Sequence, residues 1–232
     1  MAGVKRIDAF LAQAERTIPE ERESAARGDI VLSHVTFGYG EKSVLTDFSM
    51  TVKQGEQVTL VGRTGAGKST VFKLLLGLYS PESGSITIGG VDVSDIADSE
   101  RRACIGCVEQ HFSRVPGTVL DQITLGDARI TEEMAKNAAR LAGIDAAIAS
   151  LPEGYDTVCT DGMFSQGEWQ LLSIARAAAA DPAVLLLDEI TANLDAETEA
   201  RVLEALRRAS EGRTVLSVSH RVYENLGGRT IE

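Results

Sequence analysis

The sequence predicts an α/β fold, and three observations along the chain carry that prediction. The apolar run 183–187 has the length of a strand and shows no alternation, which is typical of a strand buried on both faces of a parallel sheet. The glycine-rich segment 62–70 lies between an apolar run of strand length and a helical pattern. Between these two segments the patterns are mainly helical. We therefore expect a parallel core with a helical insertion.

Periodicity places the remaining elements. Strand patterns before and after the glycine-rich segment predict a β-rich flank around it. A helix begins at Thr131, which suits an N-cap, and ends before Gly143. The other expected strands are 30–37, 49–52, 57–61, 84–88, 103–108 and 214–218, and the other expected helices are 71–76, 145–150, 166–180 and 196–209.

The glycine-rich segment itself predicts a phosphate-binding loop. From Val61 to Thr70 it reads Val-Gly-Arg-Thr-Gly-Ala-Gly-Lys-Ser-Thr, which fills every fixed position of the G-x-x-x-x-G-K-[ST] template. Its glycines let backbone N–H groups point at an anion, and the helix N-terminus adds partial positive charge. Lys68 is expected to reach the β- and γ-phosphates, and the Ser69 hydroxyl to complete a Mg²⁺ shell. The residues expected at the nucleotide are Gly62, Arg63, Thr64, Gly65, Ala66, Gly67, Lys68, Ser69 and Thr70.

Two carboxylates follow the apolar run 184–187, at the end of a strand where ligands bind in open α/β sheets. Asp188 fits a Mg²⁺ ligand, direct or through water, and Glu189 fits the group that activates an attacking water. His220 ends a further apolar strand, where an imidazole can hydrogen-bond a γ-phosphate. The alternative is that these are solvated polar residues at strand ends. The phosphate loop elsewhere in the chain favours the catalytic interpretation.

Composition limits the class of protein. The 232 residues are 44% hydrophobic and carry a net charge of −11, which argues against a nucleic-acid partner because phosphates are neutralised by clustered Lys and Arg. No apolar run approaches the roughly 18–20 residues that cross a bilayer. A membrane role is therefore expected to come through a partner or further sequence. Cys104 and Cys107 spell C-x-x-C, but without a second pair we interpret them as small packing residues.

In order and spacing these motifs resemble those of the ATP-binding cassette (ABC) ATPases, and the resemblance covers residues 29–220. The further matching positions are Tyr39 in Phe37-Gly38-Tyr39, Gln110 in Val108-Glu109-Gln110, Ser165 and Gly167 in Phe164-Ser165-Gln166-Gly167-Glu168-Trp169-Gln170, and the run Asn193-Leu194-Asp195. The resemblance implies a P-loop NTPase (RecA-like) core with an antiparallel β flank and an inserted helical subdomain. It also implies ATP and Mg²⁺ as cofactors, stacking of Tyr39 on adenine, contact of Gln110 with Mg²⁺ or water, and His220 as a switch residue.

The resemblance further implies a second ABC ATPase domain as partner. In this family Ser165 and Gly167, at the start of a long helix, face the γ-phosphate bound by the other subunit. Here Gln166 and Glu168 replace the usual Gly and Gln, while Glu189 is intact. That combination resembles one half of a heterodimeric exporter. A homodimer that tolerates the change is the alternative, and the sequence leaves both open.

The resemblance extends to the branch of the family. Residues 1–28, with a short amphipathic stretch at 6–11 and a charged segment after it, resemble the connector from a preceding membrane domain of an exporter. Residues 29–232 would form the ABC ATPase domain, with the helical subdomain at about 111–164. We expect a transmembrane domain as partner, a place at the cytoplasmic face of the cell membrane, and ATP hydrolysis that powers export. A non-hydrolysing regulatory module and an importer ATPase are the alternatives; a nucleic-acid-linked ATPase is disfavoured by the charge.

Overall fold

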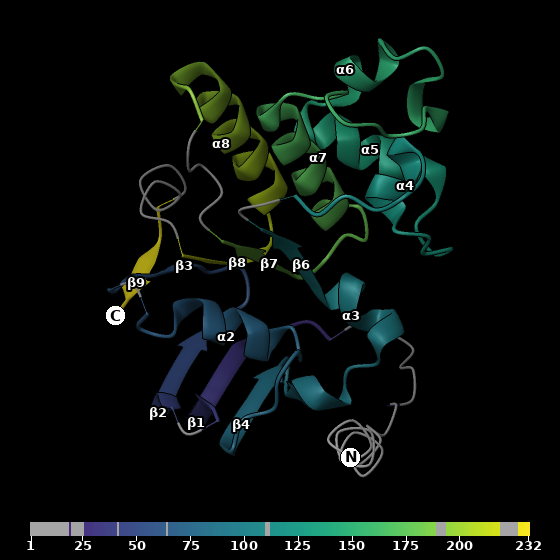
Figure 1. The fold of residues 1–232 in the computed structure, drawn as a ribbon. Helices are drawn as coiled ribbons and strands as arrows, with labels where there is room; N and C mark the ends of the chain where they lie inside the picture. Colours follow the sequence, from purple (N-terminus) through teal and green to yellow (C-terminus); the bar gives the residue numbers. More distant parts are fainter. Residues whose placement is uncertain are drawn as a thin grey trace, which may run out of the picture.

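The computed structural model describes residues 19, 26–40, 42–63, 65–109, 112–188, 194–218 and 227–232. Two sheets and the helices between and beside them form successive layers (Figure 1). The expected α/β fold with an antiparallel flank is confirmed. The expected helix at 6–11 lies outside the described residues. No helix within those residues has the length and apolar character needed to cross a membrane.

The antiparallel sheet is the β-rich flank that the sequence predicts. Its strands run in the order β2-β1-β4-β5. A tight turn at Gly89 and Gly90, both with positive φ, connects the last two strands. The strands are β1 (Ile30–Tyr39), β2 (Lys42–Val52), β4 (Ser83–Ile88) and β5 (Val91–Asp92).

The second sheet is parallel throughout, with strand order β6-β7-β8-β3-β9. Because all its strands point the same way, the loops that leave their carboxyl ends gather at one edge. The strands are β3 (Gln57–Leu60), β6 (Ile105–Val108), β7 (Val184–Leu187), β8 (Thr214–Ser217) and β9 (Arg229–Ile231).

Helices cover both faces of the parallel sheet. Helix α2 lies between the two sheets, whereas α5, α7 and α8 lie on the opposite face (Figure 1). The α-helices are α2 (Lys68–Leu75), α3 (Asp98–Cys104), α4 (Val119–Thr124), α5 (Glu132–Ala142), α6 (Asp145–Ala149), α7 (Gln166–Ala178) and α8 (Ala196–Ser210), and the 3₁₀ turns are η1 (Val93–Asp95) and η2 (Gly154–Asp156). Thr131 caps α5 as expected, since its hydroxyl accepts from the Met134 N–H.

Strand β7 shows why the core has two sides. All four of its residues are buried. Val184 and Leu186 belong to the core beneath the sheet, with α2 and the antiparallel strands. Leu185 and Leu187 belong to the core above it, with α5, α7 and α8. Side chains alternate across a strand, so a continuous apolar run supplies both cores at once.

Several features differ from the expectation from sequence, which did not include helices α3 and α4. Strand β2 begins at Lys42 rather than 49. Polar residues alternate along its exposed half, and its pairing with β1 is irregular around His34 and Asp47, both with positive φ, so the first half shows no clear strand pattern. Residues 103 and 104 end helix α3 rather than begin a strand. Strand β9 pairs with β3, a long-range contact that local pattern does not indicate. Cys104, Cys107 and Cys159 form no disulfide, and burial raises the pKa of Cys107 to about 12.

Helix α7 lies close to the parallel sheet at Gly106 in β6. A Cβ built on Gly106 would lie 2.5 Å from the Ala177 carbonyl oxygen of α7 and 2.9 Å from a methyl group of Leu185. The absence of a side chain at this position therefore allows α7 to lie directly on the sheet.

We expect Gly106→Ala to lower the free energy of unfolding by about 1–3 kcal/mol, because backbone atoms of α7 would have to move. Urea unfolding followed by circular dichroism measures this. Adding Leu185→Ala should not restore stability, since the Ala177 carbonyl remains in the way. An unchanged unfolding midpoint in Gly106→Ala would show that α7 is free to shift.

Candidate nucleotide-binding site

The glycine-rich loop connects β3 to α2 at the carboxyl edge of the parallel sheet. Strand β3 lies between β8 and β9, so the loop leaves the interior of the sheet. The hydroxyls of Thr59 and Ser217, 2.7 Å apart and buried, join β3 to β8. The Val61 N–H donates to the Ile231 carbonyl over 2.8 Å and extends the pairing with β9. The base of the loop is thus held on both sides.

Backbone conformation in the loop requires glycine. Gly62, Gly65 and Gly67 have φ values of +144°, +85° and +93°, a region that side chains with a Cβ rarely adopt. Gly67 is the N-cap of α2 and makes no side-chain cap hydrogen bond. The first N–H groups of α2 have no intrahelical acceptor by position. A bound anion fits this end, which supplies donors and the positive end of a helix dipole.

Lys68 turns back over this loop. Its Nζ donates to the carbonyl oxygens of Gly62 and Arg63 over 2.8 and 3.0 Å. Among the described residues these two contacts leave one of the three ammonium donors for a ligand. A cavity of about 250 Å³ adjoins the loop, lined in part by Gly62, Gly67 and Lys68 and by Val44 and Leu45 of β2. The lysine therefore presents a positive charge where a phosphate would enter.

Tyr39 lies at the end of β1 and comes close to the same helix. Its hydroxyl is 3.5 Å from the Thr70 hydroxyl, and the Lys73 ammonium lies 5.5 Å from its ring centroid. Phe37 and Tyr79 both contact the ring edge-on, with centroid distances of 5.0 and 5.3 Å. The structure thus brings the predicted adenine-stacking residue to the end of the loop. Sequence analysis missed Tyr79 and Lys73, although an aromatic in a turn after a helix is a detectable signal.

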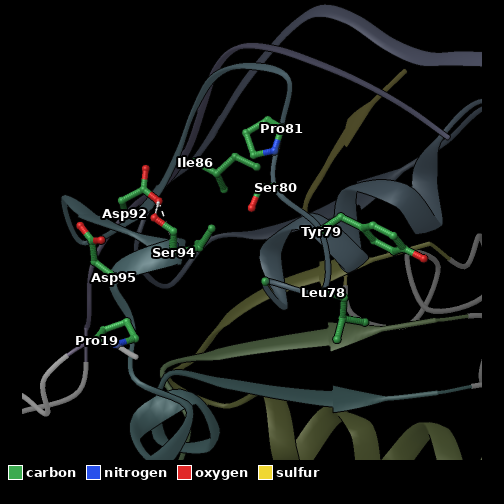
Figure 2. Close-up of a pocket in the computed structure, with 11 residues that line it drawn as sticks. Pro19, Leu78, Tyr79, Ser80, Pro81, Ile86, Asp92, Ser94 and Asp95 are labelled. Atoms are coloured by element: carbon green, nitrogen blue, oxygen red, sulfur yellow. Dashed lines mark hydrogen bonds between the residues drawn. The ribbon is translucent and has the colours of Figure 1, made fainter. Parts of the chain in front are cut away.

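A larger cavity, about 680 Å³, lies beyond the other end of α2 (Figure 2). The carboxylates of Asp92 and Asp95 line it, and Asp92 accepts from the Ser94 hydroxyl over 2.7 Å. Two negative charges disfavour a triphosphate. None of its lining residues belongs to the glycine-rich loop, so the smaller cavity is the candidate for the nucleotide.

Asp188 follows β7 at the same edge as the loop. One strand, β8, separates β7 from β3. The Asp188 N–H donates to the Val108 carbonyl over 3.0 Å, and the residue is half-buried. The fold therefore places a carboxylate and the glycine-rich loop on one side of the sheet. Glu189, His220, Thr64 and Gln110 lie outside the described residues.

Ser165 and Gly167 lie elsewhere, at the N-terminus of α7. Ser165 is exposed and caps the helix, with its Oγ accepting from the Glu168 N–H over 3.3 Å. Helix α7 and helix α2 lie on opposite faces of the parallel sheet (Figure 1). The two predicted phosphate-binding elements therefore belong to different layers of the molecule.

Helix α7 also holds both sides of the predicted glutamine loop. Gln170 Nε2 donates to the Glu109 carbonyl over 3.1 Å, on one side of residues 110–111. On the other side, Arg176 donates to the Ser113 carbonyl over 2.8 Å. Phe112 stacks on Trp169 with a centroid distance of 5.2 Å, and the Arg176 guanidinium lies 3.9 Å from the Phe112 centroid.

Arg176, which is half-buried, makes further contacts in this arrangement. It also donates to the Gln122 carbonyl over 2.6 Å, and Arg102 donates to the Arg176 carbonyl over 3.2 Å. Burial, and then the like charge of Arg102, lower the pKa of Arg176 to about 10. Both arginines remain charged at pH 7. Main-chain carbonyl groups accept most of the hydrogen bonds described for Arg176 and Arg102, and the Gln122 side-chain oxygen accepts one more from Arg176.

Comparisons with known proteins show what this chain is similar to. A family model described as ABC transporter matches residues 45–192. The chain is 38% identical over 228 residues, 96% of its length, to the "Uncharacterized ABC transporter ATP-binding protein YfiC" of Bacillus subtilis. It is 39% identical over 206 residues, 88% of its length, to the "Probable multidrug resistance ABC transporter ATP-binding/permease protein YheH" of the same bacterium.

A solved structure of a bacterial Atm1-family ABC exporter with ATP bound matches 99% of the chain with a TM-score of 0.80 and 30% sequence identity. The chain covers 38% and 31% of the lengths of the two curated relatives and 42% of the solved chain. The similarity therefore concerns one domain of those longer proteins.

Two arginines that stack on the Phe112–Trp169 pair offer a matched comparison. Arg176 is half-buried and bonded to carbonyls, whereas Arg114 is exposed, lies 5.5 Å from the Trp169 centroid and pairs with Asp161. We expect Arg176→Met to lower the free energy of unfolding by about 2–3 kcal/mol, because buried carbonyl groups then lose their hydrogen-bond donor. Arg114→Met should cost less than about 1 kcal/mol. Thermal and urea unfolding measure both; equal costs would contradict the structural role of Arg176.

Proposed function

The chain belongs to the ABC transporter family, and on that premise we propose that it is the ATP-hydrolysing domain that powers export by an attached or associated transmembrane domain. The observation that carries the proposal is the glycine-rich loop with Lys68 turned over it, at the same sheet edge as Asp188. The exporter-type relatives and the Atm1-family exporter support the direction of transport. Such a domain acts at the cytoplasmic face of the cell membrane.

The residues present fit a magnesium nucleotide. The first N–H groups of α2, Lys68 and the glycines of the loop are donors for phosphates, and Tyr39 offers a ring for the base. The Ser69 hydroxyl, Asp188 and Gln110 are proposed to hold Mg²⁺. Within the described residues, no group of three His, Cys, Asp or Glu side chains is arranged to hold a metal. Mg²⁺ needs no such group, since it takes one or two protein ligands beside phosphate oxygens and water.

Each catalytic residue has one task in the proposed mechanism. When bound, Mg²⁺ supplies positive charge at the phosphate oxygens. Lys68 adds a second positive charge there, which stabilises the charge that develops on the oxygens. Glu189 accepts a proton from the water that attacks the γ-phosphorus. His220 donates a hydrogen bond to the γ-phosphate and so responds to its loss.

The proposed partner is a second ABC ATPase domain, which completes the site across the nucleotide. The geometry supports this because Ser165 and Gly167 belong to another layer than the loop of the same chain. The loop of one domain and α7 of the other then supply donors to one triphosphate. Loss of the γ-phosphate removes the bridge between the domains. A homodimer and a heterodimer both satisfy this scheme.

One observation favours a second candidate function, a module that holds ATP without hydrolysing it. The Ser165 hydroxyl donates to the Glu168 carboxylate over 2.9 Å. In a symmetric dimer both sites would have that altered donor. An unchanged rate of phosphate release in Glu189→Gln would favour this candidate.

Removing the loop lysine tests nucleotide binding. Lys68→Ala should weaken binding of MgATP at least about a hundredfold, because a charge-assisted contact with the phosphates is lost. Isothermal titration calorimetry measures the affinity. Lys136→Ala, which removes an exposed lysine of α5 paired with Glu132, is the control and should bind normally. Equal affinity of Lys68→Ala and the unmodified chain would refute the assignment of the loop.

Removing the proposed general base tests catalysis. Glu189→Gln should lower phosphate release about 10²–10⁴-fold while MgATP still binds, since the amide no longer accepts a proton. A phosphate-release assay on the transporter assembled with its membrane domain measures the rate. Glu133→Gln, at an exposed position in the first turn of α5, should leave the rate unchanged.

A further inference from the structure

Three aromatic rings from two separate segments contact one another beside helix α2. Phe37 and Tyr39 belong to β1, and Tyr79 lies in the turn between α2 and β4. The ring centroids are 5.0 Å apart for Phe37 and Tyr39, 5.3 Å for Tyr39 and Tyr79, and 5.5 Å for Phe37 and Tyr79. Each ring therefore contacts the other two. Tyr39 meets both neighbours at nearly right angles, 86° and 87°, which is the edge-to-face geometry that aromatic pairs prefer.

The three rings differ in their exposure. Phe37 is 5% exposed and belongs to the core beneath the sheet, whereas Tyr39 and Tyr79 are 39% and 44% exposed. Tyr79 also borders the larger cavity, but its ring points away from Asp92 and Asp95 on the far side of that cavity (Figure 2). Core packing therefore accounts for Phe37. It does not account for two tyrosines that contact each other and remain open to solvent.

The other contacts of Tyr39 hold its ring only loosely. Its hydroxyl lies 3.5 Å from the Thr70 hydroxyl, which is long for a hydrogen bond between two hydroxyl groups. The Lys73 ammonium lies 5.5 Å from the ring centroid, but it is carried by an exposed and flexible side chain. The plane of the Tyr39 ring is therefore determined mainly by the two aromatic neighbours, of which only Tyr79 lies outside the core.

We propose that Tyr79 is a positioning residue for the nucleotide base, because it holds the Tyr39 ring in the orientation that receives the base. The inference rests on the proposed function, which places the base at Tyr39. A ring that is ordered before binding loses less conformational freedom when a base stacks on it, and the affinity is higher for that reason. Tyr79 thus strengthens binding of the nucleoside part of ATP and leaves the phosphate contacts of the glycine-rich loop unchanged.

The test separates the base from the phosphates. Isothermal titration calorimetry on the full chain measures the Kd for MgATP and for magnesium tripolyphosphate, which has three phosphates and no base. Tyr79→Leu keeps an apolar side chain but removes the ring, and it should raise the Kd for MgATP about three- to tenfold. The Kd for tripolyphosphate should stay within about a factor of two. Tyr79→Phe should bind both ligands like the unmodified chain, since the ring and not the hydroxyl makes the contact.

A double-mutant cycle tests whether Tyr79 acts through Tyr39. Tyr39→Leu should raise the Kd for MgATP, and adding Tyr79→Leu to it should change that Kd by less than about twofold, because the ring that Tyr79 positions is absent. Tyr155 is a matched control, since the Lys136 ammonium lies 5.5 Å from its ring centroid, as the Lys73 ammonium does from that of Tyr39. Tyr155 belongs to the helical layer, so Tyr155→Leu should leave both constants unchanged.

Three outcomes would overturn the inference. An unchanged Kd for MgATP in Tyr79→Leu would show that Tyr39 needs no support. An equal loss of affinity for tripolyphosphate would assign Tyr79 to the structure of α2 and its loop. Additive losses in the double variant would mean that Tyr79 does not act through Tyr39. Failure of the unmodified chain to bind either ligand would instead refute the proposed function, so the two failures are distinguishable.

Discussion

The burial of β7 on both faces determines where polar groups of the site can lie. Every side chain of that strand is apolar and enclosed between two cores. A charged residue within it would need a partner that neither core contains. The first position where a carboxylate becomes tolerable is the strand end, at Asp188. Parallel pairing then places this end beside the loop that leaves β3, so the sheet brings together residues 120 positions apart in the chain.

The joint between the sheet and the helical layer depends on two arginine side chains that donate hydrogen bonds to main-chain carbonyl groups. Arg102 and Arg176 lie together and donate to main-chain carbonyl groups of α4 and of the segment after residue 111. Several carbonyl acceptors share each guanidinium group. Small movements of the helical layer relative to the sheet therefore disturb these hydrogen bonds less than they would disturb a single ion pair with fixed geometry. The stacked rings of Phe112 and Trp169 cover the same joint. The helical layer is thereby attached through directional hydrogen bonds, in which one carbonyl acceptor can take the place of another.

Local chemistry explains what could be predicted. The loop at 62–70 was predictable because its glycines and Lys68 encode one backbone conformation over nine residues. Helix α5 was predictable from Thr131 and Gly143, which cap its two ends. The capping box that Ser165 and Glu168 form at the start of α7 is also a local feature. The sequence analysis noted only that Glu168 replaces the usual glutamine of the family pattern, and it did not predict the cap.

Long-range pairing explains what could not be predicted. Strand β9 exists because residues 229–231 find an open edge beside β3, and no periodicity in three residues can indicate that. Strand β2 extends back to Lys42 because β1 supplies a partner across an irregular pairing. Tyr79 joins Tyr39 only through the fold, since forty residues separate them in the chain. The roles of Glu189, Gln110 and His220 remain predictions from motif and family resemblance.

Helix α7 combines two attachments that are separate in the sequence. Its first residue follows Ser165, and its later residues Gln170 and Arg176 hold the main chain on either side of residues 110–111. A helix of this length behaves as a stiff rod. A rotation that presents Ser165 to a neighbouring domain would therefore displace the flanks of the glutamine loop in the same movement. A change at the nucleotide that Ser165 faces would thereby be transmitted to the glutamine loop through α7 and the side chains of Gln170 and Arg176.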